Sequence, residues 1–140
     1  MDWKKNNYFI TDDSNQYDLE AIHHFLTNCY WAQGRSKEVI AESIRNSFTL
    51  GLFRDEEQVG FARVITDYCT FAYLCDVYVL EAHRKNGLGH FLMECIFQHP
   101  KLASVKWLLK TTSAQSLYRD FGFNDLESPL GWMMRKPTSP

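Results

Sequence analysis

The stretch that decides the interpretation of this chain covers residues 79–90 and has the sequence V-L-E-A-H-R-K-N-G-L-G-H. Gly87 and Gly89 allow the backbone to bend until several N–H groups point outward at the start of the following helix. Arg84 and Lys85 add positive charge beside these groups, which suits a pyrophosphate better than a single phosphate. The segment therefore predicts an anion site, although a plain turn before a helix would use the same glycines.

Two widespread nucleotide-binding patterns fit this segment poorly. The chain lacks the G-x-x-x-x-G-K-[ST] phosphate loop. Its G-x-G also lacks the third glycine and the downstream acidic residue of a dinucleotide-binding fingerprint. An enzyme that binds nucleotides through either pattern is therefore disfavoured.

Apolar periodicity places the loop between a strand and a helix. It predicts strands at residues 8–10, 48–53, 59–65, 71–80, 105–109 and 131–134, and helices at residues 18–29, 36–45, 88–98 and 114–121. Ser36 and Ser113 are the expected N-caps of the second and fourth helices. The order β-α-α-β-β-β-α-β-α-β predicts an α/β (α+β) layer structure, and the early hairpin argues against a doubly wound sheet.

Composition limits the class of protein. The chain has 140 residues, 45% of them hydrophobic, and a formal net charge of −2, which predicts one globular domain over residues 1–140 and no nucleic-acid partner. No apolar run approaches the ~20 residues of a membrane helix and the amino terminus is polar, so no membrane association and a cytoplasmic location are expected. The four cysteines form no C-x-x-C pair, so we expect reduced core thiols and no metal.

Two motifs together resemble the GNAT superfamily of acetyl-CoA-dependent N-acetyltransferases. The pattern V-x-x-x-x-[RQ]-x-x-G-x-[GA] is matched by Val79, Arg84, Gly87 and Gly89, and A-x-x-L-Y-x-x-x-G-F is matched over residues 114–123. The resemblance is carried by motifs from residue 59 to residue 123 and by element order before that. It implies the GNAT fold, a mixed and mostly antiparallel central sheet flanked by helices, with acetyl-CoA as co-substrate.

The resemblance also implies which residues bind acetyl-CoA. The preceding strand would offer backbone hydrogen bonds to the pantetheine arm, and the loop would wrap the pyrophosphate at the helix N-terminus. These residues are Val77, Tyr78, Val79, Arg84, Lys85, Asn86, Gly87, Leu88, Gly89 and His90. Thr111 stands where relatives often have an asparagine, so one side-chain contact to the pantetheine differs here.

The expected reaction is attack of a neutral amine on a thioester, which needs a base for the amine and an acid for the thiolate. The resemblance implies that Tyr118 is the general acid, the alternative being an aromatic that only shapes the cleft. Asp76 is the first candidate base and Asp67 the second, each acting through a water. A hydrogen-bonded strand carboxylate is the alternative for Asp76.

The resemblance also implies that the loop between the first two helices borders the acceptor site. Tyr30 and Trp31 stand near Arg35 there, and two aromatics beside a guanidinium suit an acceptor with a ring or a carboxylate. Equally, Trp31 could belong to the core and Arg35 could be a solvated charge. The acceptor is an unidentified primary amine, expected on a small molecule.

Two questions stay open at this stage. A GNAT-like module that binds acetyl-CoA as a sensor or subunit, without turnover, is the main alternative function. A homodimer could use the segment Trp132-Met133-Met134, although these apolar residues are equally expected inside the core.

Overall fold

The computed structural model describes residues 1–29 and 31–138 of the chain. The strands are β1 (Asp2–Lys5), β2 (Tyr8–Thr11), β3 (Phe48–Arg54), β4 (Glu57–Thr66), β5 (Phe71–Val79) and β6 (Lys106–Leu109). The helices are α1 (Leu19–Thr27), α2 (Lys37–Arg45), α3 (Leu88–Gln98) and α4 (Gln115–Arg119), with short 3-10 turns at Ser14–Gln16, Glu81–His83 and Pro100–Leu102. None of the helices in these two ranges is long and apolar enough to cross a membrane.

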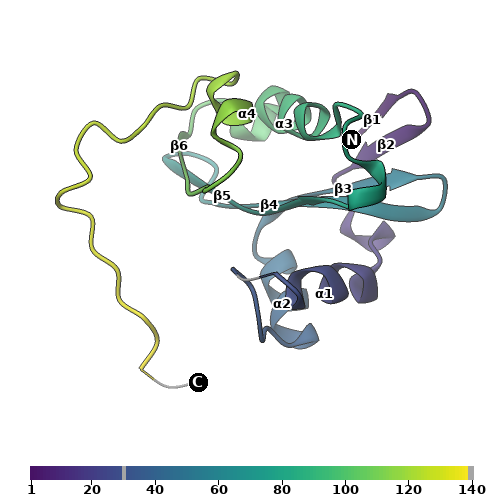
Figure 1. The fold of residues 1–140 in the computed structure, drawn as a ribbon, viewed down its shortest axis with the longest axis horizontal. Coiled ribbons are helices and arrows are strands. Elements are labelled where there is room, and N and C mark those ends of the chain that lie inside the picture. Colours follow the sequence, from purple (N-terminus) through teal and green to yellow (C-terminus); the bar gives the residue numbers. More distant parts are fainter. Residues whose placement is uncertain (30, 139–140) are drawn as a thin grey trace.

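The strands form one sheet in the order β1-β2-β3-β4-β5-β6. Neighbouring strands are antiparallel from β1 to β5, and β6 is parallel to β5. Helices α1 and α2 cover one face of the sheet, and α3 and α4 cover the other (Figure 1). The predicted mixed, mostly antiparallel sheet flanked by helices is thus confirmed.

Local capping explains where the helices begin. Asp18 accepts a hydrogen bond from the backbone N–H of Ala21 at 3.0 Å, and Ser36 accepts one from Val39 at 3.1 Å, as predicted for Ser36. The prediction of Ser113 as the N-cap of α4 is wrong. Thr111 Oγ1 instead accepts the N–H of Ala114 at 3.1 Å, so the residue at the unusual motif position holds the loop that leads into α4.

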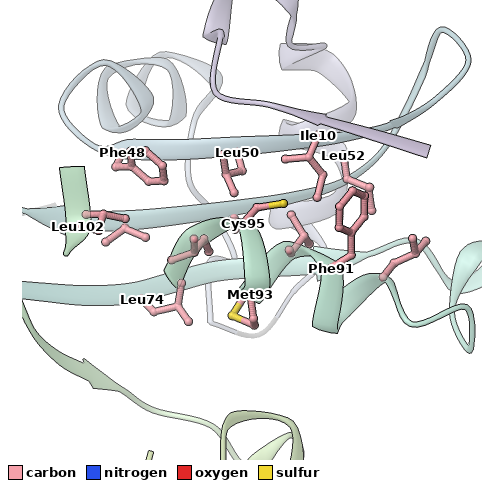
Figure 2. Packing of buried hydrophobic residues seen from close by; sticks show 14 of the residues in the cluster. Ile10, Phe48, Leu50, Leu52, Leu74, Phe91, Met93, Cys95 and Leu102 are labelled. Carbon is pink, nitrogen blue, oxygen red and sulfur yellow. The ribbon is translucent and has the colours of Figure 1, made fainter. Parts of the chain in front are cut away.

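The main core lies between the sheet and α3. Phe91, Met93 and Cys95 of α3 pack against Leu50 and Leu74 of the sheet (Figure 2). A second, smaller cluster fills the other face, where α1 and α2 meet the sheet; its buried members are Ile22, Leu26, Ala32, Ile40, Phe61 and Tyr78. Full burial of each large apolar side chain contributes about 1.5–3 kcal/mol, so α3 is fixed firmly against the sheet.

The polar amino-terminal residues form a strand that the sequence analysis did not predict. Residues 2–5 form β1, and a two-residue turn, Asn6-Asn7, leads into β2, so that Lys5 pairs with Tyr8. Asn6 takes a φ of 54°, a conformation that asparagine tolerates better than most residues. The Asn-Asn pair before an apolar strand was the sequence signal for this hairpin.

The prediction of a last strand at residues 131–134 is wrong. These residues form no strand, and Trp132, Met133 and Met134 are exposed. Gly131 has a φ of 102°, and the N–H of Trp132 bonds to the carbonyl of Pro129 at 3.4 Å, which turns the chain after residue 129. A short apolar run forms a strand only where a sheet edge pairs with it, and this segment pairs with none among the described residues.

The cysteines are free thiols with different environments. Cys95 is buried and Cys29 and Cys75 are half-buried, but Cys69 is exposed in the turn between β4 and β5. The expectation of a core thiol is therefore wrong for Cys69. Within residues 1–29 and 31–138, no three His, Cys, Asp or Glu side chains are grouped so that they could hold a metal ion.

Candidate functional site

The loop after β5 is held by hydrogen bonds within itself. Arg84 Nε donates to the Val79 carbonyl at 2.9 Å, and Asn86 Nδ2 donates to the His83 carbonyl at 2.9 Å. Lys85 and Gly87 both have positive φ, 67° and 73°. The shape of the loop is therefore fixed by contacts within the loop itself.

The start of α3 presents free backbone donors. Gly87 is the N-cap and makes no side-chain capping bond, and the first intrahelical bond runs from the Phe91 N–H to the Gly87 carbonyl at 3.0 Å. The N–H groups of residues 88–90 precede that bond and have no intrahelical acceptor. Together with the positive end of the helix dipole, they are the groups that an anion site requires. A Cβ on Gly89 would meet Leu117 Cδ2 at 3.3 Å, so this glycine lets α4 approach α3 closely.

Several of the predicted cofactor residues can contribute only through the backbone. The Leu88 side chain is buried in the main core, and the Tyr78 ring stacks on Phe25 with centroids 3.8 Å apart on the α1 side of the sheet. His90 Nε2 lies 3.1 Å from Asp120 Oδ2, in an orientation that makes no hydrogen bond, so its ring faces α4 rather than the loop. Val77 and Val79 pack toward the main core.

Lys5 of β1 lies beside the loop, a position that no sequence pattern indicated. Its Nζ is 3.9 Å from where a Cβ on Gly87 would be, and 5.8 Å from the centre of the Phe91 ring. Among the described residues no carboxylate lies within 4.0 Å of this ammonium. Lys5 is far from the motif in sequence, and only the β1–β2 hairpin brings it to α3.

A β-bulge interrupts β5 at Asp76. Phe61 pairs with Tyr78 and Arg63 pairs with Cys75, so two residues of β5 face one residue of β4. Asp76 takes a φ of 50°, which is uncommon for a residue other than glycine. The bulge directs Asp76 to the α1–α2 side of the sheet, where it meets Arg35, whereas Val77 and Val79 face the main core.

A cavity of about 500 Å³ opens where β5 and β6 stop pairing, beyond Leu74 and Leu109. Cys75, Asp76 and Val77 line one wall, while residues 109–114 and Tyr118 line the other and Trp31 lies at the rim. The structure thus brings together three of the four predicted catalytic and acceptor residues. Tyr30 lies outside the described residues.

Tyr118 presents its phenol to this cavity. Its ring packs edge-on against Phe123 with centroids 5.9 Å apart, and burial raises the pKa of the phenol above its ordinary value of about 10. Within the described ranges no group bonds to its hydroxyl. The hydroxyl is therefore protonated at neutral pH and available to a ligand.

Two arginines hold the Asp76 carboxylate. Arg35 Nη1 and Arg63 Nε each donate to Asp76 Oδ2 at 2.8 Å, and Arg63 Nη1 also donates to Ser47 Oγ at 3.1 Å. The Asp76 side chain is 1% exposed, and its Oδ1 has no hydrogen-bond partner in the described parts of the chain. Asp76 thus forms ion pairs through Oδ2, while its buried Oδ1 remains a hydrogen-bond acceptor without a partner among the described residues.

The surroundings of Asp67 and Cys75 argue against a catalytic role for either side chain. Asp67, the second candidate base, accepts backbone N–H bonds from Cys69, Thr70 and Phe71 in the β4–β5 turn, and its hydrogen bond from the Thr70 hydroxyl holds its pKa well below the usual range. It does not line the cavity. Cys75 does line it, but burial raises the pKa of its thiol to about 11. The thiol is therefore protonated at neutral pH and poorly suited as an acyl acceptor.

Known proteins are similar to this chain in both sequence and fold. The family model described as "Acetyltransferase (GNAT) domain" matches residues 45–125. A crystal structure of a proposed GNAT-family acetyltransferase from Xanthomonas campestris pv. campestris is 35% identical, has a TM-score of 0.91 and covers 96% of each chain. A proposed acetyltransferase of Gibberella zeae is 28% identical over 89% of this chain and 84% of its own length. A GNAT acetyltransferase of Elizabethkingia anophelis, whose structure contains acetyl-CoA, shares the fold at 19% identity and a TM-score of 0.63, covering 86% of this chain and 78% of its own. Because this family model matches more than half of the chain and a relative of 35% identity covers 96% of it, this protein belongs to the GNAT acetyltransferase family.

Proposed function

We propose that residues 1–140 form one domain that transfers the acetyl group of acetyl-CoA to the primary amine of a small molecule. The observation that carries this proposal is the cavity between β5 and β6, which is lined both by Asp76, whose buried Oδ1 has no partner among the described residues, and by Tyr118. Asp76 can accept a proton and Tyr118 can donate one. Amine acylation by a thioester needs both functions.

Acetyl-CoA fits the groups that surround the cavity. Its pyrophosphate would accept hydrogen bonds from the backbone N–H groups of residues 88–90, next to Arg84 and Lys85. β6 pairs with β5 only as far as Leu74, so among the described residues the β6 side of the Val77–Val79 backbone has no strand partner and can bond to the amides of the pantetheine arm. The thioester supplies an activated acyl group, and the fold neighbour from Elizabethkingia anophelis was crystallised with acetyl-CoA.

The proton movements can be assigned to residues of this chain. As the amine attacks, a C–N bond forms, and Asp76 Oδ1 takes a proton from nitrogen directly or through one water. When the C–S bond breaks, the Tyr118 hydroxyl donates its proton to the departing thiolate. Because the Cys75 thiol is protonated, a route through an acetylated cysteine is disfavoured. The amine therefore attacks the thioester directly, in a complex that contains the enzyme and both substrates.

The acceptor would enter beside Trp31. Trp31 is half-exposed at the cavity rim, where its ring can pack against an apolar part of the acceptor. Arg35 is committed to Asp76 through one nitrogen, and its side chain stays 29% exposed. The main role of Arg35 is therefore to hold Asp76 in place, and its exposed part can also contact the acceptor.

The first experiment is a calorimetric titration with acetyl-CoA and with CoA. The Arg84→Ala, Gly87→Glu variant removes one cation and places a carboxylate at the N-terminus of α3, so we expect both dissociation constants to rise by about 30-fold or more. The matched control is Arg45→Ala, Val39→Glu, which makes the same change in net charge on exposed positions of α2. Its dissociation constants should stay within twofold of the parent.

Each result of this titration has a separate meaning. If the parent protein binds neither ligand, the proposed function is wrong. If it binds both and acetylates no member of a broad amine panel, the non-catalytic sensor becomes the better assignment. Acetylation of any amine, followed through the release of free thiol, would remove that alternative.

Lys5 should contribute to cofactor affinity through the phosphates. For Lys5→Gln we expect the dissociation constant for CoA to rise about threefold to tenfold, because an unpaired ammonium next to Gly87 favours a phosphate there. Lys4→Gln is the matched control, since adjacent strand residues point to opposite faces. Pantetheine, which has no phosphate, should bind equally to all three proteins. Equal losses in Lys4→Gln and Lys5→Gln would contradict a specific contact.

A further inference from the structure

The cavity between β5 and β6 has more positive than negative charge around it. Asp76 is the only acidic side chain among the described residues that line it. The guanidinium groups of Arg35 and Arg63 both donate to Oδ2 of this carboxylate at 2.8 Å. Lys110 also lines the cavity and adds a third cation. The side chains in and directly behind the wall of the cavity therefore carry one negative and three positive charges.

Lys110 has no acidic partner in residues 1–29 and 31–138, because no carboxylate lies within 4.0 Å of its Nζ. It follows β6 directly, and its neighbour Leu109 packs toward the main core on the α3 side of the sheet (Figure 1). Adjacent residues of an extended chain point to opposite faces, so Lys110 lies on the α1–α2 side, where Asp76 meets Arg35. Its ammonium is therefore available to a negative group of a ligand on that side.

Arg35 also keeps unused donors beside Asp76. A guanidinium has five N–H donors, and the Nη1 bond to Asp76 is the only side-chain hydrogen bond that Arg35 makes within the described parts of the chain. The Arg35 side chain is 29% exposed, whereas that of Arg63 is 10% exposed and has a second partner in Ser47. Of the two arginines, Arg35 is thus the one that can contact a ligand.

The binding position for the amine is next to these cations. Asp76 Oδ1 is buried and has no partner among the described residues, while Oδ2 of the same carboxylate contacts Arg35. An amine that donates to Oδ1 therefore places its neighbouring atoms close to Arg35, with Lys110 also in the cavity. A negative group near the amine would find both cations there.

We propose that the acceptor is a free amino acid, a primary amine with a carboxylate close to its nitrogen. The amine donates to Asp76 Oδ1, and the carboxylate accepts hydrogen bonds from Arg35 and Lys110. Hydrogen bonds between charged groups are stronger than neutral ones, so they select the acceptor as well as orient it. This proposal rests on the proposed function and specifies its acceptor.

The same groups disfavour other classes of acceptor. A polyamine would bring a second ammonium into a cavity that already contains Lys110, and like charges repel. An amine without a carboxylate would leave Lys110 unpaired and gain nothing from Arg35. Trp31 is 43% exposed at the rim of the cavity, where it can pack against an apolar side chain of the acceptor. An amino acid with an apolar side chain therefore fits the cavity best.

Acetylation of matched pairs of acceptors tests this assignment. Each pair consists of an amino acid and the amine that remains when its carboxylate is removed: tryptophan and tryptamine, phenylalanine and phenethylamine, leucine and isoamylamine. We expect kcat/KM for the preferred amino acid to exceed that of its amine by about tenfold or more, because the carboxylate adds hydrogen bonds between charged groups. Spermidine should be a poorer acceptor than that amino acid.

Variants at Lys110 separate the effect of charge from that of amine basicity. In Lys110→Gln the ratio of kcat/KM between the two members of the pair should fall by about fivefold or more. It should fall further in Lys110→Glu, which places a negative charge at the same position. Lys106→Gln is the matched control, since Lys106 is exposed on the same face of β6 and does not line the cavity. Its ratio should equal that of the parent.

Calorimetry distinguishes this proposal from the proposed function. Protein saturated with CoA is titrated with both members of each pair. If an amino acid binds about tenfold more tightly than its amine but nothing is acetylated, the charge of the acceptor is as proposed and the transfer reaction is wrong. If the amines or spermidine are acetylated as well as the amino acids, or if Lys106→Gln and Lys110→Gln change the ratio equally, the transfer stands and the amino-acid assignment is wrong. A protein that neither binds nor acetylates any of the three amino acids would also overturn this assignment.

Discussion

The Tyr118→Phe variant should lose about 100-fold or more in kcat while its dissociation constant for acetyl-CoA changes less than twofold. Proton donation by a positioned side chain typically contributes 10²–10⁴-fold. The substitution keeps the ring that packs on Phe123 and removes only a hydroxyl with no hydrogen-bond partner among the described residues. Because the contact to the departing thiolate strengthens in the transition state, kcat and kcat/KM should fall together.

Tyr73→Phe is the matched control for this result. Tyr73 lines the same cavity and is half-buried, but it lies on β5, in the part that pairs with β6. Its variant should retain kcat within about threefold. If both variants lose activity equally, or if Tyr118→Phe is fully active, Tyr118 only shapes the cavity.

The pH dependence of the parent enzyme gives a second check on Tyr118. Burial raises the pKa of its phenol, so the neutral form that can donate a proton persists above pH 10. A limb of the kcat profile that falls between pH 8 and pH 9 would therefore have to belong to another group. A loss of kcat that begins only above pH 10, and that is absent in Tyr118→Phe, is the expected behaviour of the parent.

The shape of the candidate cofactor loop could be predicted from sequence because its determinants are contiguous. Val79 and Gly89 are ten positions apart, and the chemistry lies in backbone N–H groups whose placement follows from glycines and a helix start. The side chains within the motif were harder to place. Nothing local indicates that His90 turns toward α4 or that Tyr78 stacks on Phe25.

The remaining features depend on contacts between distant parts of the chain. Arg35 and Arg63 reach Asp76 from 41 and 13 positions away, and the bulge that directs Asp76 appears only in the register of β4 against β5. Lys5 reaches the loop through a hairpin. The predicted strand at residues 131–134 failed for a related reason, since a strand also needs a neighbouring edge and none pairs with this segment among the described residues.

The Asp76→Asn variant should be impaired in both stability and catalysis. Arg63 is buried and shares Asp76 Oδ2 with Arg35, so removing the negative charge leaves a buried guanidinium unbalanced. Breaking one partner of a buried pair usually lowers the free energy of unfolding by about 3–5 kcal/mol. Loss of the proton acceptor at Oδ1 should lower kcat by about 100-fold at neutral pH. Urea unfolding and steady-state kinetics measure the two effects.

Two further measurements distinguish the role of Asp76 as a base from its role as an ion-pair partner of the arginines. In Asp76→Asn, Arg63→Gln the unbalanced charge is removed, so much of the lost stability should return while kcat stays low. The rate of Asp76→Asn should also approach that of the parent as the pH rises toward the pKa of the amine, because a neutral amine needs less help from a base. An ion pair that only positions the strand would show the opposite pattern: activity would return together with stability in the double variant, and the ratio of the two rates would not depend on pH. That result would leave Asp76 as a positioning residue and would transfer the role of base to a water held at the bulge.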